Sequence, residues 1–302
     1  MKEYRNEIII ALVSIIGAIL ATWFFFFSID EKKITVQSDL FSVVAPNPNA
    51  LLCINRPSML SKIILSDDYT KKIFAPHLPP VFAKIIDKNP GIPFYLISYH
   101  EQGEVIYANA TLEQAYQIAD NILHPYFSSF DPKRTLIDKA EFTFYALPGN
   151  RFFVTYYNQG VWAASFSKKL LDEICLQQKI GQTALSDRIL SQKKLMDRNA
   201  PLNLLMPAPS LDISVQINDS IRMGLGNGWI YADLFSSDGK LCCFSGIPYN
   251  AQLDSIYPIM ADSVVRRLKS FYPNHNFLPQ LSKDAERIYF TACLVQPDSV
   301  SR

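Results

Sequence analysis

The chain has 302 residues, a formal net charge of +1 and 49% hydrophobic residues. Acidic and basic residues are interspersed without a basic arm or stripe, which argues against nucleic acid as a partner. The length is ample for one large folded domain or two smaller ones. No metal-binding, phosphate-binding or dinucleotide-binding motif is complete, so we expect no cofactor.

The first element is an uncharged apolar run from Ile8 to Ile29, preceded by a short tail of residues 1–7. A helix of this length crosses the roughly 30 Å hydrocarbon core of a bilayer. The run ends in Trp23 and Phe24–Phe27, where a signal peptidase would need small residues, so we predict a retained signal anchor. A buried core helix is the alternative, but such a helix usually keeps a polar stripe, which this run lacks.

Positive charges are balanced across the run, since Lys2 and Arg5 precede it and Lys32 and Lys33 follow it. The charge bias therefore does not set the orientation. For a single N-terminal anchor we expect residues 1–7 inside and the large domain outside. Small residues recur at four-residue spacing along the run, which lets two membrane helices approach closely. These candidate packing residues are Ser14, Gly17, Ala18 and Ala21.

After a spacer of residues 30–45, the residue pattern predicts an α+β fold of antiparallel sheets with helices packed on one side. Strands are predicted over 50–55, over 93–110 as a hairpin, over 141–167 as three strands, and as five further strands between 202 and 295. Amphipathic helices are predicted over 57–64, 81–86, 111–123, 168–178, 187–198 and 253–272. Thr111 and Gln114 have the spacing of a capping box, and Pro125 is expected to end that helix.

Pro201, Pro207 and Pro209 mark a seam, so residues 46–200 are assigned to one α+β subdomain. Residues 201–302 are either a second, similar subdomain or a continuation of the same domain. Three strand-to-helix junctions resemble one another: LLCINRPSMLSKII, VWAASFSKKLLDEI and CCFSGIPYNAQLDSI. An internal duplication would explain this likeness, and so would the shared chemistry of helix caps.

The five cysteines include no C-x-x-C pair, and the four histidines are scattered beside turns, so no zinc site is expected. Buried free thiols are the favoured state of the cysteines, although their number leaves room for one disulfide bond. His100 next to Glu101 is the strongest acid–base candidate, but neighbours in a hairpin need not converge on a substrate. A non-enzymatic role is therefore favoured over an enzymatic one, and the sequence leaves both open.

Aromatic residues crowd the three strands predicted over 141–167. Alternation sends their side chains to both faces, and an outward-facing set would bind a lipid, a glycan or a protein. The candidate surface residues are Tyr145, Tyr156, Tyr157 and Trp162. If both faces are covered, the same residues form core, and this second interpretation is favoured.

The segments PFYLISYHEQGEVIYANAT, FVTYYNQGVWAASFSKKLLDEICLQQ and ALSDR resemble a family of membrane-anchored extracytoplasmic proteins of Bacteroidota, a domain of unknown function. The resemblance covers roughly residues 46–187. It implies an N-terminal anchor and a location in the bacterial envelope, and it brings no activity with it.

Together these features predict a single-pass protein of the bacterial inner membrane whose large domain lies in the periplasm. Its expected role is a non-enzymatic interaction or assembly module, with a protein partner or a second copy of itself. The alternative is a periplasmic domain that binds lipid or glycan through the aromatic sheet. An enzyme whose site is assembled from distant residues is the least favoured class.

Overall fold

In a computed structural model, the chain divides into two compact units, residues 1–37 and residues 38–302. The structure describes residues 38–60, 75–207, 214–218, 221–224, 228–237, 240–248, 276–283 and 287–295. The predicted anchor, its packing residues and the predicted helix over 253–272 lie outside these ranges.

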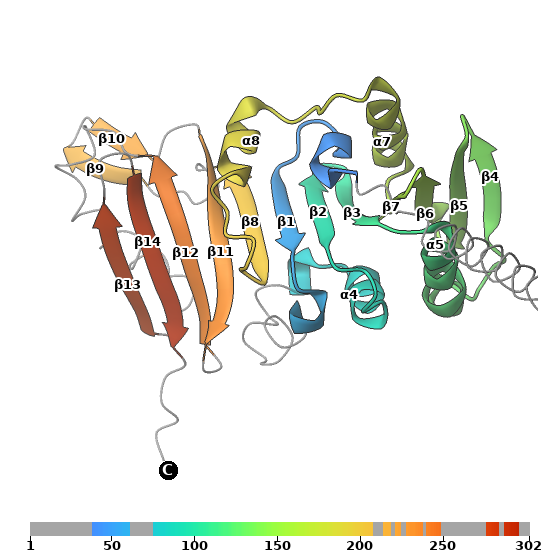
Figure 1. Ribbon diagram of the computed structural model, residues 1–302, viewed down its shortest axis with the longest axis horizontal. Coiled ribbons are helices and arrows are strands. Elements are labelled where there is room, and N and C mark those ends of the chain that lie inside the picture. Colours follow the sequence, from blue (N-terminus) through green and yellow to red (C-terminus); the bar gives the residue numbers. More distant parts are fainter. Residues whose placement is uncertain are drawn as a thin grey trace, which may run out of the picture. The chain divides into compact units, whose positions relative to one another are not determined.

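The described residues of the second unit form a 12-stranded antiparallel sheet and a separate two-stranded sheet (Figure 1). In the large sheet the strand order is β13-β14-β12-β11-β8-β1-β2-β3-β7-β6-β5-β4. Its strands are β1 (Ala50–Ile54), β2 (Tyr95–His100), β3 (Gly103–Asn109), β4 (Lys133–Ile137), β5 (Ala140–Leu147), β6 (Arg151–Asn158), β7 (Val161–Ser165), β8 (Leu202–Pro207), β11 (Trp229–Ser237), β12 (Lys240–Pro248), β13 (Asn276–Lys283) and β14 (Arg287–Val295). The small sheet pairs β9 (Ser214–Asn218) with β10 (Ile221–Gly224). The predicted α+β class with antiparallel sheets is confirmed.

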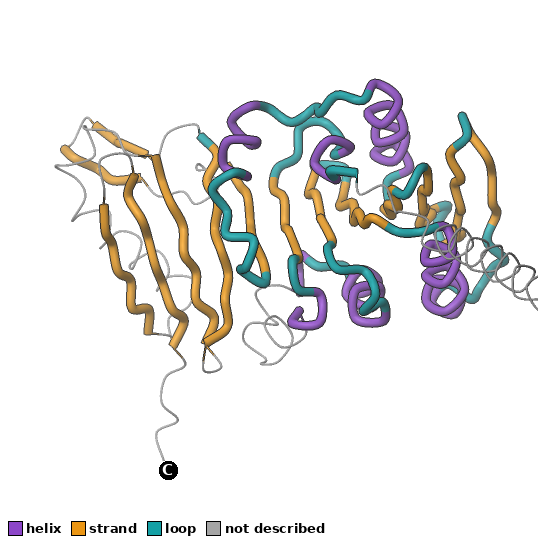
Figure 2. Tube along the Cα trace, in the orientation of Figure 1, coloured by secondary structure: helices purple, strands orange, loops and turns teal. Residues whose placement is uncertain are grey.

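Short helices connect the strands (Figure 2). They are η1 (Leu40–Val43), η2 (Pro57–Met59), η3 (Ala75–His77), α4 (Pro80–Lys88), α5 (Leu112–Ile118), η4 (Ala119–Leu123), α6 (His124–Tyr126), α7 (Lys168–Ile180) and α8 (Asp187–Lys193). The predicted capping box is confirmed, since Gln114 N donates to Thr111 Oγ1 and Thr111 N donates to Gln114 Oε1. The predicted stop at Pro125 is wrong, because the π-helical turn η4 leads into α6. Pro125 lies in the first turn of α6, where proline needs no backbone donor.

Helices cover both faces of the sheet, so the expectation that they pack on one side is wrong. One buried cluster joins α4, α5, η4 and Phe127, the residue after α6, to the first face, and a second joins η1, α7 and α8 to the other. Strand β1 contributes to both, with Leu52 and Ile54 in the first cluster and Leu51 and Cys53 in the second. The physical reason is visible in the sequence, because strands that are apolar at successive positions need cover on both sides.

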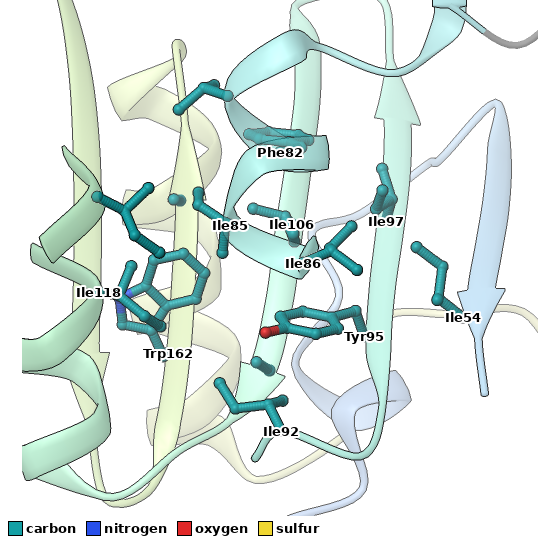
Figure 3. Packing of buried hydrophobic residues seen from close by; sticks show 14 of the residues in the cluster. Ile54, Phe82, Ile85, Ile86, Ile92, Tyr95, Ile97, Ile106, Ile118 and Trp162 are labelled. Atoms are coloured by element: carbon teal, nitrogen blue, oxygen red, sulfur yellow. The ribbon is translucent and has the colours of Figure 1, made fainter. Parts of the chain in front are cut away.

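The first cluster is built around α4. Its apolar side chains lie against the sheet, where they meet isoleucines of β1, β2 and β3 and the indole of β7 (Figure 3). The labelled residues of this core are Ile54, Phe82, Ile85, Ile86, Ile92, Tyr95, Ile97, Ile106, Ile118 and Trp162. All are at most 2% exposed. This packing fixes β2, β3 and β7 as the rigid centre of the sheet.

The order of the strands is similar on the two sides of the neighbouring strands β1 and β8. Strands β2 and β3 follow β1 in the sequence and in the sheet, and β11 and β12 follow β8 in the same manner. Beyond them, β7 lies next to β3 on one side and β14 lies next to β12 on the other. One sheet therefore continues across residue 200, where the sequence suggests a seam.

A buried polar network lies where β1, β8 and β11 meet. Asn203 and Asp233 are opposite each other in the ladder and are only 1% and 2% exposed. Asn203 Nδ2 donates to Asp233 Oδ1 over 2.6 Å, and Asn55 Nδ2 donates to Asn203 Oδ1 over 2.5 Å. Asp197 N donates to the second carboxylate oxygen of Asp233 over 3.1 Å, which ties the segment after α8 to the sheet. Burial raises the pKa of Asp233 above its usual value, against the opposing effect of these donors.

The raised pKa predicts how stability changes with pH. Folded Asp233 holds its proton more tightly than the unfolded chain does, so its contribution is fully present below the ordinary aspartate pKa of 3.8. That contribution is lost as the pH rises through the raised value. We expect Asp233→Asn to remove this component from the pH dependence of the free energy of unfolding, measured by urea titration of the full chain in detergent.

Asp87→Asn is the matched control, because Asp87 is exposed on α4. This control should keep the wild-type pH profile. A profile of Asp233→Asn parallel to that of the wild type would contradict the assignment.

Candidate binding groove

Strand β4 is the outermost strand at one end of the large sheet, and it pairs with β5 alone (Figure 1). No strand is predicted over these residues from the sequence. The alternating sequence KRTLI was the available signal, because Lys133, Thr135 and Ile137 share one face and Arg134 and Leu136 share the other. Leu136 is 72% exposed, so the face that carries it is uncovered at this edge.

A groove of about 720 Å³ lies over the other face of β4, β5 and β6. Its lining includes Asp131, Lys133, Thr135, Ile137, Phe144, Ala146, Asn150, Arg151, Phe152, Val154, Phe166 and Lys168. The strand register explains why its floor is apolar. Phe144 lies opposite both Lys133 and Val154, and Ala146 lies opposite Phe152, so these side chains share one face.

The groove exists because helical cover ends at the first residue of α7. This helix packs its apolar side on β6 and β7, burying Leu170, Leu171 and Ile174. Ser167 occupies the N-cap position of this helix but makes no side-chain hydrogen bond there. Lys168 follows it and lies over the ring of Phe142, with 5.8 Å from Nζ to the ring centroid. Helix α7 therefore covers β6, β7 and the Ala140–Phe142 part of β5, while the same face stays open at Phe144 and Ala146.

Two phenylalanines of the lining are unusually exposed for core-forming side chains, Phe152 at 46% and Phe166 at 44%. Phe144 and Phe152 meet edge to face, with ring centroids 6.3 Å apart. The ring of Phe166 packs in the same manner on Phe153, over 5.0 Å, and Phe153 belongs to the core cluster of the opposite face. Their rings are thus held in place by the sheet while part of each surface remains in contact with water. Such concave apolar surfaces are typical of binding sites.

The groove carries more positive than negative charge. Lys133, Arg151 and Lys168 provide cations, and Asp131 provides a carboxylate. Lys168 Nζ also pairs with Asp172 over 2.6 Å, and Arg151 Nε donates to the carbonyl oxygen of Pro148 over 3.3 Å. Lys133 makes no ion pair with any residue that the structure describes. An anion in the groove would therefore meet at least one cation that has no acidic partner.

The predicted aromatic surface is not a surface in this structure. Tyr145, Tyr156 and Trp162 are at most 2% exposed, and Tyr157 is half-buried. Tyr145 and Trp162 belong to the first core cluster and Tyr156 to the second. The favoured interpretation of these residues as core is the one that the structure supports, because helices cover both faces of β6 and β7. Alternation nevertheless locates an open aromatic set nearby, on Phe144 and Phe152.

The acid–base candidate His100 belongs to a hydrogen-bonded cluster. Its Nε2 lies 2.8 Å from Ser98 Oγ, which is 3.0 Å from the hydroxyl of Tyr107. Tyr107 in turn accepts a hydrogen bond from Ala45 N over 3.3 Å. Ser98 has no exposed surface, so no substrate reaches its hydroxyl, and burial lowers the pKa of His100. The cluster fastens the segment around residue 45 to β2 and β3.

Thiols and metal ligands were also expected to play no chemical part. No group of His, Cys, Asp or Glu among the described residues has the arrangement of a metal site. Cys53, Cys175 and Cys243 are free, and burial raises the thiol pKa of Cys53 and Cys243 to about 12. Cys242 is disulfide-bonded, so the expectation of a free thiol is wrong there. The strand register explains how a bond can form, since Cys242 lies opposite Cys293 in the β12–β14 ladder.

Within the part of the chain that the structure describes, no helix is long and apolar enough to cross a membrane. The predicted span of residues 8–29 precedes that part. Its candidate packing residues, Ser14, Gly17, Ala18 and Ala21, therefore remain predictions from the sequence.

Comparison with known proteins identifies a shared fold and no family. No protein-family model matches the chain, and no curated protein sequence is significantly similar to it. The solved structure of TP0453 in crystal form I has a TM-score of 0.50 at 10% sequence identity, covering 86% of this chain and 94% of that one. Crystal form IV gives a TM-score of 0.43 at 12% identity, covering 83% and 91%. At this identity the first match shows similarity of fold alone, and the second is too distant to support an argument.

Two of the buried tyrosines give a paired prediction. The hydroxyl of Tyr145 is buried without a hydrogen-bond partner among the described residues, whereas Tyr156 donates to Gln178 Oε1. Removing an unpaired buried hydroxyl relieves its desolvation, so Tyr145→Phe should leave the free energy of unfolding unchanged or raise it by about 1 kcal/mol. Tyr156→Phe should lower it by about 1 kcal/mol, because Gln178 loses its partner. Urea unfolding of both full-length variants tests the pair.

The opposite order of stability would contradict the core assignment of these side chains. A loss of ligand binding in Tyr145→Phe without a change in stability would instead restore its role as a surface residue.

Proposed function

We propose that this is a single-pass protein of the bacterial inner membrane, with residues 8–29 as its anchor and residues 38–302 as a periplasmic domain. Its role in this proposal is a non-enzymatic interaction or assembly module. The observation that carries the proposal is the uncharged run from Ile8 to Ile29, followed by a separate compact unit. Charged residues close the run on both sides, as expected of a membrane span.

Two further observations support an extracytoplasmic location. The disulfide bond of Cys242 is of a kind that persists in oxidising compartments such as the periplasm. The resemblance of residues 46–187 to anchored envelope proteins of Bacteroidota points to the same compartment. Neither observation depends on the charge balance around the anchor.

An interaction role, as opposed to an enzymatic one, is favoured by the state of the reactive side chains. The Ser98 hydroxyl, which contacts His100, is fully buried, and the pKa values of two free thiols are raised well above neutrality. Thiols in that state are poor nucleophiles. The groove over β4–β6 supplies apolar surface and cations, which suit binding better than acid–base chemistry.

A second candidate function, a periplasmic domain that binds a lipid or a glycan, is favoured by the groove itself. From the sequence, the binding surface was expected to consist of Tyr145, Tyr156, Tyr157 and Trp162. In this proposal the ligand binds in the groove, at Phe144 and Phe152. Both candidates share the same anchor and topology.

The anchor and topology are tested together in cells. The full-length protein should stay with the membrane pellet at alkaline pH, because a spanning helix resists conditions that strip peripheral proteins. Protease added to intact spheroplasts should digest residues beyond the spacer and leave the N-terminal tail protected. Release at alkaline pH would exclude the anchor, and digestion only after lysis would place the domain in the cytoplasm.

Self-association through the anchor has its own test. Native mass spectrometry of the full-length protein in mild detergent should show a dimer, and Gly17→Leu with Ala21→Leu should shift it to the monomer by blocking close approach of the helices. Ile10→Leu with Ile16→Leu is the control and should keep the dimer. A wild-type monomer without a second polypeptide would contradict the interaction role.

A further inference from the structure

The groove over β4–β6 leaves apolar side chains in contact with water, although folding of the domain does not require this exposure. Phe152 is more than two-fifths exposed, yet its ring is fixed against that of Phe144. Scattered apolar residues on a surface need no explanation, but rings gathered in one concavity do. Removing these ring surfaces from water is favourable. The groove is thus suited to an apolar occupant.

Its size limits what that occupant is. A volume of about 720 Å³ lies within the range of sites for one small molecule. Polar groups that could read the hydroxyls of a sugar are few, with Thr135 and Asn150 as the uncharged ones in the lining. A hydrocarbon chain therefore matches the floor better than a glycan does.

The charges on the groove limit the head group. The groove has three cations, Lys133, Arg151 and Lys168, and only two carboxylates in or beside it, Asp131 and Asp172. One positive charge remains, which complements a single negative charge. Arginine binds a carboxylate through parallel N–H donors, and the aliphatic stems of lysine and arginine extend over neighbouring apolar surface. A monoanionic carboxylate fits this balance better than a dianionic phosphate ester.

We propose that the groove binds one long-chain fatty acid, with its hydrocarbon chain on the ring surfaces of Phe144 and Phe152 and its carboxylate at Arg151 and Lys133. This inference deepens the ligand-binding candidate and rests on it. It is independent of the anchor, because every residue that it uses lies in the unit of residues 38–302.

The test uses the full-length protein in nanodiscs of zwitterionic lipid and a long-chain fatty acid that carries a photoreactive diazirine. After irradiation, mass spectrometry should locate the label in peptides from residues 133–168. Excess oleate should lower this labelling about tenfold, whereas oleyl alcohol, which lacks the charge, should not, because a hydrogen bond to a charged group contributes about 1.5–3 kcal/mol. Label confined to residues 8–29, or label that oleate does not compete for, would overturn the proposal.

Matched variants separate charge from hydrocarbon. Lys133→Gln with Arg151→Gln should lower labelling of the groove about tenfold, and Lys88→Gln, on exposed α4 surface, should leave it unchanged. Phe152→Ala should lower labelling about fivefold, and Leu136→Ala, on the opposite face of the same edge, should not. Each variant is first shown by urea unfolding to remain folded.

The competing outcomes are distinct. Equal labelling in the groove variants and their controls would overturn the site. Stronger competition by an anionic phospholipid than by oleate would overturn the choice of head group. Failure of the alkaline extraction test would remove the anchor and leave the groove result unaffected, so the two proposals fail separately.

Discussion

The constraint on which the structure depends is that its central strands are apolar on both faces. In β1, β2 and β7, buried side chains occupy successive positions, so neither face tolerates water. Each face then requires its own helices, and the chain supplies α4 and α5 to one and η1, α7 and α8 to the other. A sheet that is covered on both sides gains apolar burial on twice the area that a one-sided sheet would bury.

This constraint weakens toward the edge strand β4, where fewer side chains are buried. The central strand β7 is buried at all five positions, whereas β4 has three exposed positions and two intermediate ones. Charged side chains on an edge strand discourage it from pairing with other chains. Lys133 and Arg134 are charged residues of this kind. Arg134 is engaged on its own face, where its guanidinium lies 4.8 Å from the ring centroid of Tyr116. Lys133 lies on the groove side of the strand. The groove therefore combines the positive charge of this edge lysine with an apolar floor.

Most strands could be predicted from the sequence, because period-two patterns and turn glycines are local signals. The hairpin around Gly103 and the capping box at Thr111 are examples in which the chemistry within a few residues suffices. The covering of both faces of the sheet by helices was not predicted. It depends on whether each apolar face meets a helix, and that is a tertiary outcome which no window of sequence contains. Strand β4 was missed because an edge strand with few buried residues resembles a loop.

The same distinction explains why the open rings are not the candidate ones: Phe144 lies one residue from the candidate Tyr145, and Phe152 lies four residues from the candidate Tyr156. Tyr145 and Phe144 are neighbours in β5, as Phe153 and Phe152 are in β6, and each pair points to opposite faces. Composition identifies an aromatic-rich strand but does not identify its covered face. Coverage is decided by where α4, α5 and α7 lie, so a partially exposed ring such as Phe152 is recognisable only in the folded chain.

Comparison of the two sides of the sheet sets the groove apart from the shared framework. Outward from β1 the order is β2, β3, β7 and β6, and outward from β8 it is β11, β12, β14 and β13. These positions correspond one to one. Strands β4 and β5 continue the first side and have no equivalent among the described strands of the second. The groove floor therefore combines β6, which has a counterpart on the second side, with β4 and β5, which have none among the described strands. Its open end depends on these two additional strands, and elements added to a shared framework commonly carry specific functions.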